Sequence, residues 1–178
     1  MEPKAIQATT QRHRAKSTGT WSYDTCRCFY KQSGSANNWS YGYMVHGPSS
    51  CDAILELMRK EVESCDRLSG FMLTSSLAGG TGSGMGAYTT ELVRDNYPKS
   101  VIVNQVVWPY DMGDVVVRGY NSILTLSHLT RVSDGVIVFD NDTVHKTARS
   151  LLGVKAPGFL DINGLIGASM ASALLPCR

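Results

Sequence analysis

The sequence lacks any apolar run approaching the roughly 20 residues that a membrane-spanning helix needs, and its N-terminus has no signal-peptide core. It also lacks a large excess of charge of either sign. Its 17 basic and 15 acidic side chains give a net charge of +2, which offers no basis for nucleic-acid binding. The basic cluster at residues 12–16 is interpreted as a solvated loop. We therefore expect a soluble intracellular protein with neither a nucleic-acid nor a membrane partner.

Residues suited to disulfides or metal sites are also few. The five cysteines are an odd number without the spacing of a disulfide framework, which predicts reduced thiols. Cys26 and Cys28 form only a C-x-C pair, and the four histidines show no paired metal spacing, so a zinc site is disfavoured. Internal repeats and low-complexity tracts are absent as well.

What the sequence does contain is 43% hydrophobic residues over 178 positions, enough for one domain with a core. Residues 49–66 open with serine and aspartate as capping candidates and carry Ile54, Leu55, Met58, Val62 and Cys65 on one helical face. Strand-like runs at 70–77, 101–107 and 135–139 alternate with helical patterns, which lie at 85–97, 115–129, 143–152 and 159–175. This alternation predicts an α/β fold: a doubly wound, mostly parallel sheet with helices on both faces and a ligand at the carboxyl ends of its strands.

The segment AGGTGSGMGAYTTEL at residues 78–92 places five glycines in nine positions between a strand-like run and a helical pattern. Glycine reaches φ > 0 without penalty and lets an anion approach the main chain closely. The order strand, loop, helix aims free N–H groups and the positive end of the helix dipole at the loop. We therefore predict a phosphate ligand there. A flexible linker is disfavoured, since linkers are not flanked by such patterns.

Two familiar phosphate loops do not fit this segment. The pattern G-x-x-x-x-G-K-[ST] needs a lysine, and none follows these glycines. The pattern G-x-G-x-x-G can begin at Gly82 and Gly84, but Ala87 stands at its third glycine. A dinucleotide-dependent oxidoreductase is disfavoured for this reason and because the acidic residue expected about 20 positions further on is missing.

The run GGTGSGMG resembles the signature loop of the tubulin family. Five further segments resemble tubulin segments in the same order: MEP at 1–3, ANNW at 36–39, GYNSILTLSHL at 119–129, FDND at 139–142 and DIN at 161–163. Residues 37–48 and 104–117 look more like the delta branch of the family than its alpha or beta branches. The resemblance covers nearly the whole chain and is weakest over residues 4–35.

The resemblance implies a site for GTP, with Mg²⁺ as its companion. The implied phosphate contacts are Ser76, Gly79, Gly80, Thr81, Gly82, Ser83 and Gly84. Asn37 lies in the loop that senses the terminal phosphate in the family, although an ordinary Asn-rich turn is the local alternative. The strands that end at Ser76, Val107 and Phe139 should bring these loops to one edge of the sheet.

The resemblance also implies contacts to the rest of the nucleotide. Asn141 and Asn163 would read the guanine edge, because an amide offers both donors and an acceptor. Phe159 matches the position that stacks on the base, with a buried core phenylalanine as the alternative. Asp114 matches a ribose contact and Glu2 the acidic residue near the magnesium.

Two local features bear on these assignments. One residue of Asp140, Asn141 and Asp142 is expected to cap the following helix. Arg118 stands where the family has a glutamate beside the ribose, and it could reach a phosphate or a partner surface instead.

The resemblance further implies that residues 1–178 form part of a GTP-binding domain, without the family's first strand and later domains. We expect a cytoskeletal protein of the cytoplasm, at centrioles or basal bodies, whose partners are other tubulin subunits or microtubules. GTP hydrolysis is expected of the full-length, assembled protein and not of this chain alone, because the family's water-activating acidic residue lies in a later loop. Another tubulin isotype, a bacterial division-type relative and a non-binding structural fragment stay open as alternatives.

Overall fold

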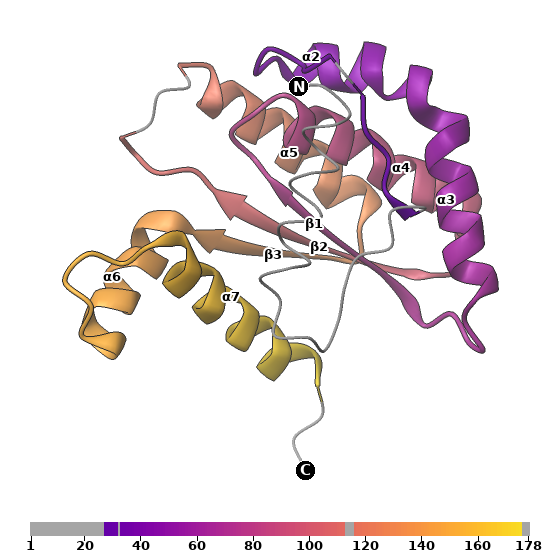
Figure 1. Cartoon of the computed structure of the whole chain (residues 1–178). Coiled ribbons are helices and arrows are strands. Elements are labelled where there is room, and N and C mark those ends of the chain that lie inside the picture. The colour runs from indigo at the N-terminus through magenta and orange to yellow at the C-terminus, as the bar shows by residue number, and fades with distance from the viewer. Residues whose placement is uncertain (1–26, 32, 113–115, 176–178) are drawn as a thin grey trace.

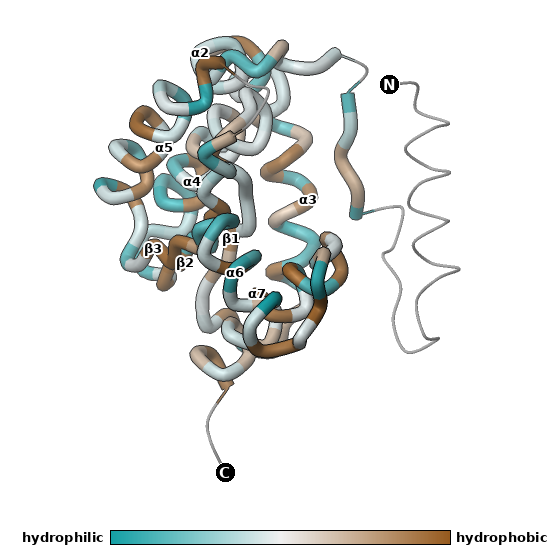
Figure 2. Tube along the Cα trace, turned by 90° about the vertical axis from the view of Figure 1, so that its left-hand side faces the viewer, coloured by the Kyte–Doolittle hydropathy of each residue, from teal (hydrophilic) through white to brown (hydrophobic). Residues whose placement is uncertain are grey.

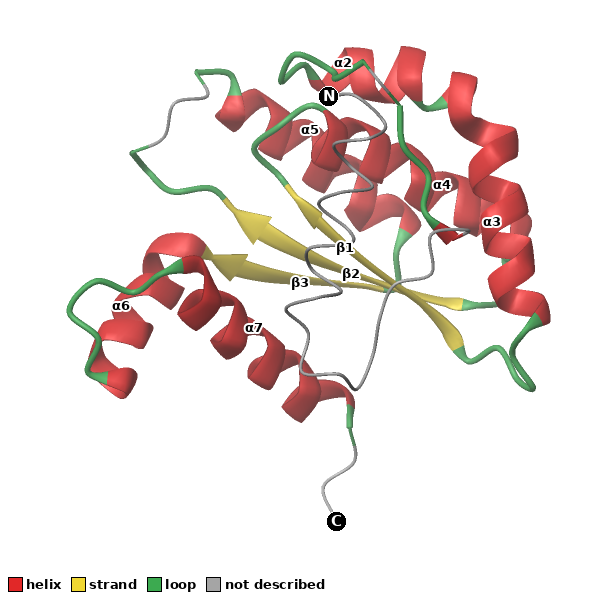
Figure 3. Ribbon diagram, viewed as in Figure 1, coloured by secondary structure: helices red, strands yellow, loops and turns green. Residues whose placement is uncertain are grey.

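The computed structural model describes residues 27–31, 33–112 and 116–175. Strands and helices alternate along most of this range (Figure 3). The strands are β1 (Gly70–Ser76), β2 (Val101–Trp108) and β3 (Gly135–Asp140), and the helices are α2 (Trp39–Tyr41), α3 (Cys51–Glu63), α4 (Gly86–Asn96), α5 (Arg118–Val132), α6 (Asn141–Leu152) and α7 (Phe159–Leu174).

The three strands form a parallel sheet in the order β1-β2-β3. Ser76 pairs with Val107 and Trp108 pairs with Asp140, so all three carboxyl ends lie at one edge. The predicted parallel α/β fold is thereby confirmed.

Helices cover both faces of this sheet: α4 and α5 lie on one face and α6 and α7 on the other (Figure 1). The core on the α5 side is built around Leu77, Val106 and Leu129, each at most 1% exposed. Leu77 directly follows β1 and precedes the glycine-rich segment, so burial of its side chain anchors the start of that segment against the sheet.

Helix α3 has the amphipathic character that its sequence predicts, with hydrophilic and hydrophobic residues alternating along it (Figure 2). Ile54, Leu55 and Met58 are half-buried, whereas Cys65 lies beyond the end of the helix and is exposed. Ser50 occupies the N-cap position but its hydroxyl makes no capping hydrogen bond.

Residues 39–50 form helical turns that the sequence analysis did not predict. Helix α2 continues into a π-helical turn at Gly42–His46 and a 3-10 turn at Pro48–Ser50. The segment packs tightly against the glycine-rich loop, because a Cβ atom at Gly42 would lie 2.2 Å from the carbonyl oxygen of Gly80. The Trp39 ring, which is 5% exposed, stacks on Tyr43 with ring centroids 4.7 Å apart.

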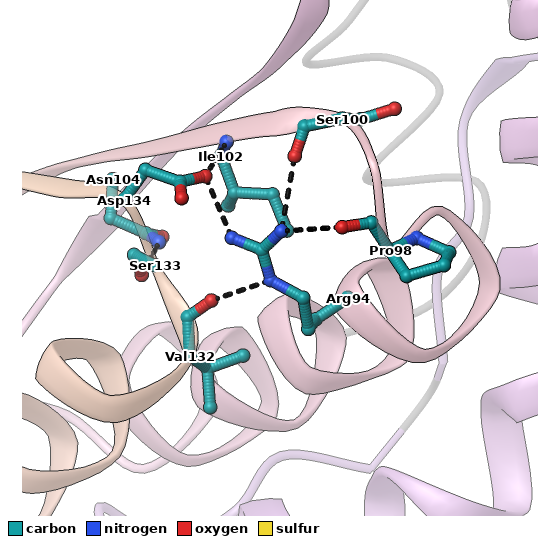
Figure 4. Close-up of polar contacts among 8 residues, drawn as sticks. All are labelled: Arg94, Pro98, Ser100, Ile102, Asn104, Val132, Ser133 and Asp134. Carbon is teal, nitrogen blue, oxygen red and sulfur yellow. Dashed lines mark hydrogen bonds and ion pairs between the residues drawn. The ribbon is translucent and has the colours of Figure 1, made fainter.

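Arg94 of α4 joins the elements at the opposite, amino-terminal edge of the sheet (Figure 4). Its guanidinium donates to the carbonyl oxygens of Val132 (2.9 Å), Pro98 (3.1 Å) and Ser100 (3.1 Å) and to Oδ2 of Asp134 (2.7 Å). The same Asp134 oxygen accepts from the N–H of Ile102 at 2.8 Å. This network fixes the ends of α4 and α5 to the starts of β2 and β3.

In the described ranges, no helix is both long enough and apolar enough to cross a membrane.

Candidate functional site

The predicted order of strand, glycine loop and helix is confirmed, but the loop is shorter than the sequence suggests. Strand β1 ends at Ser76, and a π-helical turn already begins at Thr81 and runs to Met85, where the pattern predicted the helix to start. Residues 77–80 therefore form the loop, and the later glycines lie in the first helical turns.

The N–H groups of residues 79–83 point to an anion as the ligand of this segment. None of them donates a hydrogen bond to an acceptor in the part of the chain that the structure describes. Three of them belong to the first helical turn, where N–H groups have no partner within the helix. Gly80 and Ser83 are buried, and buried N–H groups without an acceptor are costly, so this row of donors favours an acidic ligand.

The glycines of the loop do not adopt the positive φ angles that we expected. Among the described glycines only Gly153 has a positive φ, at 65°, so the expectation that this loop uses φ > 0 is wrong. Close approach explains two of them instead: a Cβ atom at Gly80 would lie 2.6 Å from the backbone nitrogen of Asn38, and one at Gly84 would lie 2.2 Å from the carbonyl oxygen of Trp39.

Gly79 and Gly82 have more room. The nearest atom to a Cβ at Gly79 would be Oδ1 of Asn37 at 3.6 Å, and at Gly82 it would be the carbonyl oxygen of Ser76 at 3.1 Å. Packing therefore does not require a glycine at position 79, and the bare backbone there leaves room for close approach of a ligand.

The turn at residues 35–38 lies against the glycine loop, as the predicted site requires. Its closing hydrogen bond runs from the N–H of Asn38 to the carbonyl oxygen of Ser35 at 2.8 Å. Ala36 and Asn37 both have positive φ, 47° and 56°, as in a type I′ turn, and alanine adopts this region only at a cost. The hydroxyl groups of Ser35 and Thr81 share a hydrogen bond of 3.1 Å, which links the turn to the start of the helix.

The hydroxyl side chains of the predicted phosphate set differ in their availability. Ser76 and Thr81 are exposed. Ser83 is fully buried and its hydroxyl donates to the carbonyl oxygen of Gly79, so this side chain holds the shape of the loop.

Sequence reasoning missed Asn121, a residue of α5 that is 3% exposed. Its Nδ2 donates to the carbonyl oxygens of Asn37 (2.8 Å) and Ala78 (2.9 Å), and its Oδ1 accepts from the N–H of Trp39 at 3.2 Å. The available signal was an asparagine on the buried face of a helix whose other buried positions are Ser122, Thr125 and Leu129.

At the end of β3, Asp140 is the helix cap that one of three residues was expected to provide. Its Oδ2 accepts from the N–H of Thr143 at 3.0 Å, and the hydroxyl of Thr143 holds the pKa of Asp140 below its ordinary value. Asn141 is half-buried at the first position of α6 and makes no side-chain hydrogen bond to a described residue. Its amide is thus available at the carboxyl edge of the sheet.

The remaining predicted base contacts lie on α7, which packs against α6. Phe159 is 76% exposed, so the alternative of a buried core phenylalanine is wrong. Asn163 is one turn further along the helix and is also exposed.

The predicted ribose and metal contacts, Asp114 and Glu2, lie outside the described residues. Arg118 begins α5 and donates to the carbonyl oxygen of Asp111. Within the described ranges, no group of three His, Cys, Asp or Glu side chains could hold a metal ion.

A parallel α/β sheet with a glycine loop of unpaired N–H groups at its carboxyl edge defines a domain of the phosphate-binding α/β class. Residues 1–149 match the family model of the "Tubulin/FtsZ family, GTPase domain", and the chain belongs to this family.

Curated relatives agree with this assignment. The chain is 48% identical to the tubulin delta chain of Macaca fascicularis, 47% to that of Canis lupus familiaris and 46% to that of Homo sapiens, each over 176 residues. These alignments include 99% of the chain and 38% of each relative, so the chain spans less than half the length of the relatives it matches. The resemblance to the delta branch of the family is confirmed.

Proposed function

We propose that this chain binds a guanine nucleotide, with GTP as the ligand, at the carboxyl edge of its sheet. The observation that carries the proposal is the row of N–H groups at residues 79–83, which have no acceptor in the described part of the chain; this segment lies against the turn at residues 35–38, whose Ala36 and Asn37 have positive φ. A phosphate chain supplies several acceptor oxygens with negative charge, which suits both these donors and the helix N-terminus behind them.

The other predicted contacts follow from this position of the phosphates. Ser76, Thr81 and Asn37 would add side-chain contacts at the rim of the loop. Asn141 and Asn163 would bind the guanine edge, and the exposed ring of Phe159 would stack on the base. Asp114 would contact the ribose.

Mg²⁺ would accompany the phosphates, with Glu2 as the acidic residue that the family resemblance assigns to it. This ion commonly keeps several waters and binds through phosphate oxygens and one or two carboxylates, so it needs no cage built by the protein alone. When bound, it would neutralise phosphate charge, and the roles given to the residues above do not depend on it.

At the level of the cell, we propose a cytoskeletal role in which the partners are other tubulin subunits or microtubules. The delta-chain relatives support placing it at centrioles or basal bodies. Pull-down of tubulin subunits from a purified mixture, with and without GTP, would test the partner assignment.

The choice of base gives the first prediction. GTP and GDP should displace a fluorescent guanine nucleotide from the 178-residue chain, and ATP should compete poorly. The substitution Asn141→Ala should weaken GTP binding by about 1 to 3 kcal/mol, because a buried hydrogen-bond partner is lost. Asn96→Ala, at the far end of α4, is the matched control. Equal competition by ATP and GTP would contradict the assignment.

A further inference from the structure

We infer that Asn121 is the positioning residue of the nucleotide site: it holds the turn at residues 35–38 and the glycine loop in the one arrangement in which both face the phosphates. This inference rests on the proposed function. It is carried by three hydrogen bonds between one buried side chain and the backbone: Nδ2 of Asn121 donates two, to Asn37 and Ala78, and its Oδ1 accepts one, from Trp39.

The geometry of the peptide bond shows how Asn121 determines the direction of the N–H group of Gly79. In a trans peptide the carbonyl oxygen and the following N–H point in opposite directions, and the described chain has no cis peptide bonds. The carbonyl oxygen of Ala78 points at Nδ2 of Asn121, 2.9 Å away, so the N–H of Gly79 points away from α5. Asn121 thereby fixes the direction of the first donor in the row of residues 79–83.

The second hydrogen bond acts on the turn. The carbonyl oxygen that accepts it, 2.8 Å from Nδ2 of Asn121, belongs to Asn37, which has a φ of 56°. Such a conformation persists only where its surroundings hold it. The third bond, from the N–H of Trp39 to Oδ1 of Asn121 at 3.2 Å, fixes the exit of the same turn.

An amide is required for this arrangement. Both hydrogens of Nδ2 are used by the two carbonyl oxygens, and Oδ1 is used by one N–H. Aspartate keeps the acceptor for Trp39 but turns an oxygen toward the carbonyl groups of Asn37 and Ala78. Alanine removes all three bonds.

The test compares Asn121→Asp and Asn121→Ala with Thr125→Val as the control. Thr125 is also fully buried on α5, but its hydroxyl donates only within the helix, to the carbonyl oxygen of Asn121 at 2.7 Å. Titration calorimetry with GDP and with guanosine separates the phosphate contacts from the base contacts. Both Asn121 variants should lose about tenfold or more in GDP affinity, as expected for the loss of two hydrogen bonds in the aspartate variant and three in the alanine variant, with guanosine affinity unchanged.

Unchanged GDP affinity in both Asn121 variants, or an equal loss for GDP and guanosine, would overturn the inference. Amide hydrogen exchange of the free protein gives a readout that does not depend on the ligand. Exchange at the hydrogen-bonded amides of Asn38, Trp39 and Ala78 should rise together in Asn121→Ala and not in Thr125→Val, and equal exchange in the two variants would overturn the inference. Failure of the wild-type chain to bind GDP, with coupled exchange of the two loops observed, would instead count against the proposed nucleotide site.

Discussion

At the scale of single residues, neighbouring glycines of one loop carry different constraints. Gly80 is held by packing, since any side chain there would meet the backbone of Asn38. Gly79 has space for a methyl group, with its nearest neighbour at 3.6 Å, and its φ is not positive. A methyl group at position 79 would therefore fit the protein but stand beside the unpaired N–H groups.

Alanine substitutions separate these two roles. Gly79→Ala should keep the thermal midpoint of unfolding and weaken GTP binding, because the methyl group hinders close approach of phosphate. Gly80→Ala should destabilise the fold by about 1 to 3 kcal/mol, the usual cost of forcing atoms into a packed site. Thermal unfolding and nucleotide displacement, measured on both variants, check the prediction. Unchanged GTP affinity in Gly79→Ala would show that the ligand does not approach this residue.

At the scale of secondary-structure elements, the two edges of the sheet differ in whether their polar groups are paired. The carboxyl edge carries loops with unpaired donors. The amino edge is closed by Arg94 and Asp134, whose hydrogen bonds connect α4, α5, β2 and β3. An arginine suits this place because its planar fork reaches four acceptors from three nitrogens, whereas a lysine presents three donors on a single nitrogen.

Because Asp134 lies at the amino edge, the free energy of unfolding should depend on pH in the acid range. The backbone N–H of Ile102, and then Arg94, hold the pKa of Asp134 below its ordinary value. A lowered pKa in the folded state contributes stability above the unfolded value of about 3.9, and this contribution is lost as the pH falls through the lower folded value. The difference in urea midpoint between wild type and Asp134→Asn should therefore be largest near neutral pH, for example at pH 6. It should decrease once the pH falls below about 4.

The control for this measurement is Asp95→Asn, which removes an exposed carboxylate on the helix that carries Arg94. Its difference from wild type should stay small at every pH. A difference for Asp134→Asn that does not change with pH would mean that ionisation of Asp134 does not support the amino edge.

The spacing of apolar residues predicted those elements in which one face is buried along the whole length of a strand or along at least two helical turns. The three strands, α3, α5 and α6 were found this way, and parallel pairing then placed their loops at one edge. The turns at residues 39–50 were missed because each is only three to five residues long and is interrupted by Gly42, Gly47 and Pro48. Their stability comes from distant contacts, such as the ring of Trp39 against His128 at 5.0 Å, which no local pattern reveals.

The site was predicted in outline for similar reasons. A glycine-rich run between a strand and a helix indicates phosphate by its order alone, so the loop could be found. Asn121 could not, because apolar periodicity says only that its position is buried. Its role depends on backbone groups 84 and 43 residues away in the sequence.

At the scale of the whole molecule, the candidate site gathers segments from residue 35 to residue 163 around one sheet edge, and the carboxylates of Asp140 and Asp142 at this edge already accept hydrogen bonds within the protein. Asp140 caps α6, and Oδ2 of Asp142 accepts from the N–H of Asp111 at 2.9 Å. The lowered pKa of Asp140 also makes it a weaker base.

We therefore predict that the purified chain holds GTP without hydrolysing it. Binding the ground state and the transition state equally gives no acceleration, and water needs a positioned group to activate it. Phosphate release, followed in the presence of Mg²⁺, should not exceed that of buffer. A clearly higher rate that disappears in Asp140→Asn or Asp142→Asn would place a catalytic acid or base inside this segment.

The sequential strand order β1-β2-β3 has a consequence for how the chain folds as it is made. Among the described strands, β2 and β3 each leave the ribosome after the neighbour with which they pair, so this part of the sheet can grow in one direction. The turn at residues 35–38 and the loop at residues 77–80 are synthesised before α5. They acquire their fixed shape only when α5 packs against the sheet and Asn121 forms its hydrogen bonds to both. In a refolding experiment followed by pulsed hydrogen exchange, the amides of Asn38, Trp39 and Ala78 should gain protection together with α5, after the pairing of β1 with β2.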